Sequence, residues 1–234
     1  DPLRATVGLA NPLSSEEPAY TTTLLPGLLE AAGRNIGRGV PGVALFETGT
    51  VAFPSDNGPA PIYGVHARPS DAELEKLLEA LPVQPQHLAV VLAGERTRSG
   101  WWGGPVDAAW SDALSVVRRL AGELGVDVQV AGAARMPWHP GRCAVISTDG
   151  VEIGHAGELH PNVCSAYGLP ARSAALEIDL DALIAAAVDV TPGPVFSTMP
   201  LAKEDVALVV DSAVPAAAVE AALREGAGAL LESV

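Results

Sequence analysis

Basic residues are scarce in this sequence. Its 234 residues include 28 Asp and Glu but only 14 Lys and Arg, so the formal net charge is −14, and the only lysines are Lys76 and Lys203. A protein that binds nucleic acid over a broad surface neutralises phosphates with clustered Lys and Arg. The composition therefore excludes a broad nucleic-acid-binding surface, and any contact with RNA must be local.

Cysteines and long apolar runs are also scarce. Cys143 and Cys164 are too few for a disulfide framework, and their spacing fits no zinc pattern. No apolar run reaches the ~20 residues of a membrane-spanning helix, and no signal segment opens the chain. We therefore expect a cytoplasmic protein with no membrane partner.

The residues that are present predict a folded chain. Hydrophobic residues make up 48% of the sequence, and the length suits one large domain or two ordinary ones. The 24 Gly and 20 Pro indicate many turns. We expect a loop-rich α+β fold in which helices flank an antiparallel sheet.

Apolar residues at helical spacing predict a first helix from Thr23 to Arg38. Thr22 and Thr23 are possible caps, and Pro26 falls in the first turn, where its missing N–H has no cost. Two apolar stretches follow, at Val43–Glu47 and Val51–Phe53. They are close enough to form a hairpin.

Further elements are predicted downstream. Ser70 and Glu73 form a capping box before a helix at 71–81, and the run 106–124 has the pattern of a long helix. Asp149-Gly150 is typical of a two-residue hairpin turn between strands. The alternation in 175–180 is typical of an edge strand.

The composition changes near the carboxyl end. Thr191-Pro192-Gly193-Pro194 has the character of a linker, so we place a domain boundary near residue 193. Beyond it, 206–210 is a predicted strand and 215–225 a predicted helix. The two predicted domains are residues 1–193 and 194–234.

Several separated blocks of sequence carry a family resemblance. They are Asn11–Glu16, Thr22–Leu29, Arg34–Asn35, Leu45–Gly49, His139–Arg142, Gly150–Gly154 and Gly157–Pro161. In their order and spacing they resemble the catalytic-like module of bacterial phenylalanyl-tRNA synthetase β subunits, in its carboxy-terminal part. The stretch 199–210 resembles the start of that subunit's ferredoxin-like anticodon-binding domain. We therefore expect a part of a longer protein that ends within that domain.

The resemblance implies a fold of the class II aminoacyl-tRNA synthetase type and a structural role. The intact subunit would support an (αβ)2 phenylalanine–tRNA ligase, whose α subunit charges tRNA(Phe) with ATP and Mg²⁺. The first helix would pack against the α subunit, and Lys203 would be the candidate tRNA contact. The interface candidates on that helix are Leu24, Leu25, Leu28, Leu29 and Ile36.

Catalysis by this module is not expected. Amino-acid activation needs cations directed at the ATP phosphates. The predicted hairpin Leu45–Phe53 contains no Arg, and the sequence holds neither a late Gly-x-Gly-x-x-Arg motif nor the Gly-Lys-Ser/Thr of a phosphate-binding loop. We therefore assign no catalytic residue and no cofactor to this chain.

Two other functions stay open at this point. His155, Glu158 and His160 could hold a metal ion in an independent hydrolase, but on a strand His155 and Glu158 would point to opposite faces. We therefore assign no metal site and expect Glu158 to be a hydrogen-bonding partner. A regulatory synthetase paralogue that binds a free amino acid is the other alternative.

The pair Trp101-Trp102 is the remaining feature of note. Exposed aromatic rings stack on bases in proteins that bind single strands. Aromatic residues are also enriched in the cores of protein interfaces. A loop anchor or a subunit contact is therefore the favoured role, with base stacking as the alternative.

Overall fold

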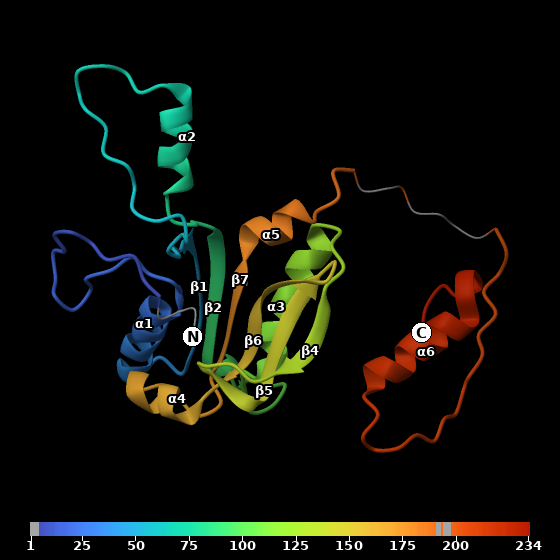
Figure 1. The fold of residues 1–234 in the computed structure, drawn as a ribbon. Helices are drawn as coiled ribbons and strands as arrows, with labels where there is room; N and C mark the ends of the chain where they lie inside the picture. The colour runs from blue at the N-terminus through green and yellow to red at the C-terminus, as the bar shows by residue number, and fades with distance from the viewer. Residues whose placement is uncertain (1–4, 191–192, 194–197) are drawn as a thin grey trace. The chain divides into compact units, whose positions relative to one another are not determined.

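The computed structural model describes residues 5–190, 193 and 198–234. By their internal contacts the residues divide into two units, 1–191 and 192–234. The expected boundary near residue 193 lies beside this division. Helices and strands are labelled in Figure 1.

Helices and strands are interspersed along the chain. They are α1 (Leu25–Gly37), β1 (Gly42–Thr50), α2 (Asp71–Glu79), β2 (Gln86–Thr97), β3 (Val106–Asp107), α3 (Trp110–Glu123), β4 (Gln129–Ala133), β5 (Trp138–Thr148), β6 (Val151–Leu159), α4 (Pro161–Tyr167), β7 (Ala174–Asp179), α5 (Leu180–Ala185), α6 (Ala216–Ala227) and the short 3₁₀ helix η2 (Gly228–Leu230).

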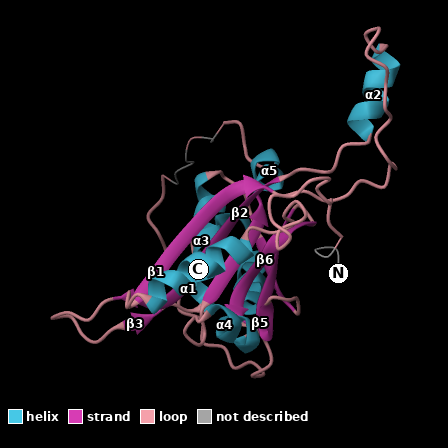
Figure 2. Cartoon of the chain, turned by 90° about the vertical axis from the view of Figure 1, so that its left-hand side faces the viewer, coloured by secondary structure: helices cyan, strands magenta, loops and turns pink. Residues whose placement is uncertain are grey.

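A seven-stranded sheet forms the frame of the first unit (Figure 2). Its order is β1-β2-β7-β6-β5-β4, with β3 added to β2, and every pair is antiparallel. The strand β7 lies between β2 and β6, and β1 forms one edge. The mixed helix-and-antiparallel-sheet architecture that the sequence predicts is confirmed.

Each face of this sheet has its own apolar core, because alternate residues of a strand point to opposite faces. Val91 of β2 and Ala175 of β7 pack with the buried residues of α1 and α4. Their neighbours Val90 and Leu176 pack instead with those of α3 and α5. The two helix layers therefore lie on opposite faces of the sheet.

Local signals in the sequence are confirmed where one element contains the whole motif. Glu73 accepts hydrogen bonds from the backbone N–H and the hydroxyl of Ser70 at the start of α2. Asp149 and Gly150 join β5 to β6 with φ angles of 49° and 78°, the left-handed conformation that this hairpin turn requires. The helix α1 has Pro26 in its first turn, as predicted, and its range Leu25–Gly37 lies within the predicted Thr23–Arg38.

The predicted hairpin within Leu45–Phe53 is wrong. The strand β1 continues to Thr50 and pairs along its length with β2. Phe53 forms an isolated bridge with Val83 instead of turning back on β1. The chain between β1 and β2 is long enough to include α2, so the true hairpin partner is remote in sequence.

Two further predictions are corrected. The residues of β7 are buried at the centre of the sheet, so the edge position is wrong. The helix predicted at 106–124 begins only at Trp110, because Val106 and Asp107 pair with β2. The Asp112 carboxylate accepts the N–H of Ala109, 2.8 Å away, and so caps the true start of α3.

The second unit contains α6, which matches the predicted helix and follows Pro215. The predicted strand at 206–210 is wrong. No described residue pairs with this stretch, and a strand is stable only when its backbone groups find partners. The ferredoxin-like identity of this unit therefore stays a prediction. Within the described part of the chain, no helix combines the length and apolar character needed to cross a membrane.

Candidate functional site

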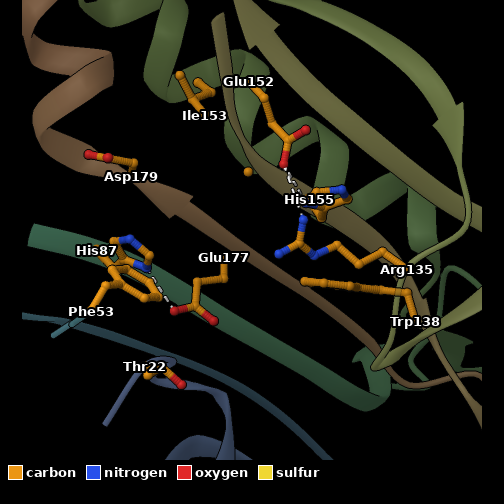
Figure 3. Close-up of a pocket in the computed structure, with 11 residues that line it drawn as sticks. Thr22, Phe53, His87, Arg135, Trp138, Glu152, Ile153, His155, Glu177 and Asp179 are labelled. Atoms are coloured by element: carbon orange, nitrogen blue, oxygen red, sulfur yellow. Dashed lines mark hydrogen bonds and ion pairs between the residues drawn. The ribbon is translucent and has the colours of Figure 1, made fainter. Parts of the chain in front are cut away.

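A cleft of about 230 Å³ opens on the face of the sheet that α1 covers. We call it the β7 cleft. Its walls come from β2, β5, β6 and β7, together with the segments that precede α1 and β5 and the segment that follows β1 (Figure 3). The lining residues are Thr22, Phe53, His87, Arg135, Trp138, Glu152, Ile153, Gly154, His155, Glu177 and Asp179.

Glu177 is the most highly bonded group in this cleft. One carboxylate oxygen lies 3.0 Å from the backbone nitrogen of Leu24 and 2.9 Å from Nδ1 of His87. The other accepts the hydroxyl of Thr23. The Glu177 side chain is 9% exposed and that of His87 14%. Because α1 has no side-chain cap of its own, this remote carboxylate holds its amino-terminal residues to the central strand.

A second polar group lies on β6. The His155 ring stacks on Trp138, with centroids 5.5 Å apart, and its Nδ1 lies 3.7 Å from a Glu152 oxygen. That same oxygen lies 3.3 Å from the Arg135 guanidinium. Burial lowers the pKa of His155, and the charge of Arg135 lowers it further, while Glu152 opposes both effects. The buried ring therefore binds a proton less readily than a free imidazole does.

The charges of the cleft are mostly acidic. Three carboxylates, those of Glu152, Glu177 and Asp179, line the cleft together with one guanidinium, that of Arg135. Each carboxylate already has a partner in the chain. Glu152 and Glu177 make the contacts described above, and Asp179 accepts the N–H of Ala182 at 2.9 Å and so caps α5. Such a site favours small neutral or cationic groups and repels a polyphosphate.

The His155, Glu158 and His160 group does not come together. Glu158 is bound by two guanidinium groups, that of Arg142 at 2.5 Å and that of Arg172 at 3.6 Å, and its side chain is 5% exposed. His155 contacts Trp138 and Glu152 instead. The expected bonding role of Glu158 is confirmed.

His160 also has a structural role. Its Nδ1 accepts the N–H of Asn162 at 3.1 Å, so it caps α4 at the turn that leads from β6 into this helix. Among the described residues, no three His, Cys, Asp or Glu side chains are placed to share a metal ion. Cys143 and Cys164 are buried and unpaired, and burial raises the pKa of both thiols, which keeps them protonated.

The predicted interface residues lie mostly inside the chain. The first four candidates, Leu24, Leu25, Leu28 and Leu29, are between 2% and 7% exposed and pack in the core beneath α1. Ile36 is partly exposed, and Lys203 is exposed in the second unit. An interface role for the helix and a tRNA contact for Lys203 stay predictions.

Sequence reasoning missed the residues that form the cleft. His87 and Glu177 are 90 positions apart and meet only because β2 pairs with β7. The one available signal was the alternation in β7, where Glu177 and Asp179 share a face. This alternation by itself predicts only an edge strand, whereas the face of Glu177 and Asp179 lines the cleft.

The fold and the cleft together define an α+β sheet module whose polar groups bind one another. Comparison with known proteins gives the family. Residues 1–180 match the model described as "Phenylalanyl tRNA synthetase beta chain CLM domain", and the chain belongs to this family. The hydrolase and the amino-acid-binding paralogue gain no support from it.

Named relatives agree with that family. The whole chain aligns with proteins named phenylalanine–tRNA ligase beta subunit, at 55% identity in Thermobifida fusca and in Streptomyces avermitilis and 49% in Cutibacterium acnes. It spans less than a third of their length, 29%, 29% and 28%.

A solved structure, pyrrolysyl-tRNA synthetase from Desulfitobacterium hafniense, matches with a TM-score of 0.48 and 12% identity. The match covers 79% of this chain and 54% of that one.

Proposed function

We propose that this chain is a structural part of a phenylalanine–tRNA ligase β subunit, with a non-catalytic module of the class II synthetase type. In the cytoplasm, the whole (αβ)2 enzyme would join phenylalanine to tRNA(Phe) with ATP and Mg²⁺. The α subunit would carry out that reaction. Family membership supports the identity of the subunit, and the chemistry of the β7 cleft supports the structural role.

The charge balance of the cleft is the observation that carries the non-catalytic role. Amino-acid activation develops negative charge on a phosphoryl group, which must be met by pre-placed cations. The β7 cleft instead presents three carboxylates and a single guanidinium, and that guanidinium is paired with Glu152. A triphosphate in this cleft would meet net repulsion.

The rate of tRNA charging by a variant complex tests this non-catalytic role directly. We expect Arg135→Ala, made in the full-length β subunit within the complex, to leave kcat for tRNA charging within about twofold of wild type. Removing a cation that stabilises a transition state costs on the order of 10²–10³ in kcat. A loss of that size would overturn the non-catalytic role.

The edge strand β1 is our proposed contact for the α subunit. Its outer edge forms no ladder with any described residue, and Phe46 on it is 73% exposed. An unpaired strand edge is a ready surface for a partner chain. The buried leucines of α1 would then support this edge from beneath, while the exposed Glu30 and Arg34 of that helix would be the groups within a partner's reach.

Co-expression with an α subunit from the same genome tests the assembly role. Phe46→Glu should prevent co-purification or weaken it by at least tenfold, because it places a charge in the apolar centre of the contact. Ile62→Glu is the matched control, since Ile62 is 99% exposed and lies outside β1. Equal complex formation by both variants would exclude the β1 surface. Failure of the wild-type subunit to bind any α subunit would contradict the proposed function itself.

Transfer-RNA binding belongs in this proposal to the second unit, as the start of a ferredoxin-like domain. Lys203 is the candidate contact, although Glu204 and Asp205 follow it directly. We expect Lys203→Ala to weaken tRNA binding by the complex less than tenfold, because one phosphate contact is lost. Filter binding at two salt concentrations would measure this, and an unchanged salt slope would rule out a phosphate contact.

A further inference from the structure

Two tryptophans occupy the tip of a tight turn between β2 and β3. Gly100 and Gly103 exchange backbone hydrogen bonds of 3.0 and 3.1 Å, which leaves Trp101 and Trp102 as the two residues of the turn. Figure 2 shows this connection extending away from the sheet beside β3. We call residues 100–103 the Trp turn.

The turn holds both rings in place without burying them. Trp101 is 94% exposed and Trp102 is 62% exposed, and the rings meet edge to face with centroids 5.9 Å apart. The Trp102 ring lies against Gly100, where an added Cβ would come within 2.6 Å of the ring. The pair is therefore pre-arranged, and Trp101 anchors nothing in its own unit.

The charged residues just before the Trp turn are basic, although Glu95 and Asp107 lie close by in the sequence. Residues 96–105 contain two arginines and no acidic residue, although acids outnumber bases two to one overall. Arg96 is paired with Asp112. Within the described part of the chain, Arg98 makes no ion pair, so one guanidinium beside the Trp turn has no salt-bridge partner.

We propose that the Trp turn is an anchor that inserts into an apolar pocket, rimmed by carboxylates, on the α subunit. This rests on the proposed function. Two indole rings contribute roughly 150–250 Å² each, which is less than the ~800 Å² per partner of a stable interface. The turn must therefore extend a contact made elsewhere, and β2 leads to it directly from Gly94, where its pairing with β1 ends. Arg98 favours an acidic rim.

Stacking on RNA bases is the weaker explanation. A base is held by aromatic faces together with cations that neutralise its phosphates. The edge-to-face arrangement does not present two parallel faces between which a base could insert, and Gly100 lies against one of the rings. One free arginine in a chain of net charge −14 offers little attraction to a phosphate backbone.

Subunit exchange tests the anchor. The full-length β subunit is assembled with its α subunit, and the exchange of fluorescently labelled α is timed. Trp101→Ala should raise the dissociation rate at least tenfold, as truncation of a buried interface Trp does. Trp101→Phe should retain most of the stability of the complex. Ile62→Ala is the matched control, because it removes an equally exposed apolar side chain elsewhere.

Two further measurements distinguish a protein anchor from an RNA contact: subunit exchange by a charge variant, and tRNA binding by the Trp101→Ala complex. Arg98→Glu should also speed exchange, and more so at low salt, if the pocket rim is acidic. Unchanged exchange for Trp101→Ala, with or without weakened tRNA binding, would overturn the proposal. If the Phe46 variant still breaks the complex in that case, only the anchor fails and the proposed function stands.

Discussion

The two faces of the strand β7 show two ways of stabilising one sheet. Leu176 and Ile178 point to the α3 face, are fully buried and pack in an apolar cluster. Glu177 and Asp179 point to the β7 cleft and are held by directional bonds to remote or adjacent residues. The first face is stabilised by buried apolar area and close packing. The second is stabilised only if each of its buried polar groups makes its hydrogen bonds.

The largest expected effect is on the apolar face. Leu176→Ala should lower the free energy of unfolding by about 2–5 kcal/mol, because it removes a fully buried side chain and leaves a cavity. Urea denaturation followed by far-UV circular dichroism would measure this. Val151→Ala, at a strand position that is 58% exposed, should cost less than about 0.5 kcal/mol. Similar losses for both variants would mean that this core is not close-packed.

The adjacent residue tests the polar face. Glu177→Gln should cost about 1.5–3 kcal/mol, because the amide cannot accept all the bonds that the carboxylate takes from Thr23, Leu24 and His87. Glu47→Gln, on the exposed part of β1, is the control. Equal and small effects on the denaturation midpoint would show that the network contributes little.

The pH dependence of the free energy of unfolding should be the next largest difference between the two faces. The folded-state pKa of His155 is lowered from its ordinary value of 6.5. The unfolded chain therefore binds the proton more readily, and stability is complete above about pH 6.5 and falls as the pH drops below it. The slope from this one group cannot exceed about 1.4 kcal/mol per pH unit. Denaturation at pH 7.5 and pH 5.0 should show that His155→Gln loses less stability on acidification than wild type.

The smallest expected effect is at the rim of the cleft. Arg135→Gln should cost less than about 1 kcal/mol at pH 7.5, because its ion pair with Glu152 is partly exposed. Its charge helps to lower the pKa of His155, so the variant should also lose stability less steeply below pH 6.5. A steeper loss in the acid titration of this variant would contradict that coupling.

The parts of the fold that could be predicted from the sequence are those whose signals lie within a few neighbouring residues. The Ser70–Glu73 capping box and the Asp149-Gly150 turn each carry their geometry within the motif. The hairpin within Leu45–Phe53 was wrong because the true partner of β1 follows a long insertion. Periodicity gives the faces of a strand, but not its neighbours.

The cleft was less predictable than the fold. Its central contact joins β2 and β7 to the residues just before α1, so it depends on the order of strands in the sheet, which no local pattern carries. The alternation of polar and apolar residues along β7 gives a polar face, but it does not show whether that face lines a cleft or lies in solvent. The bonding role of Glu158 followed from strand parity, which is a local property.

The bonds of Glu177 also impose an order on folding. They join it to Thr23 and Leu24 across more than 150 residues of chain. During synthesis, α1 emerges from the ribosome long before its capping carboxylate exists, and contacts of such sequence separation form late and slowly. The residues at the start of the first helix therefore lack this carboxylate partner until the last strand of the sheet has been made.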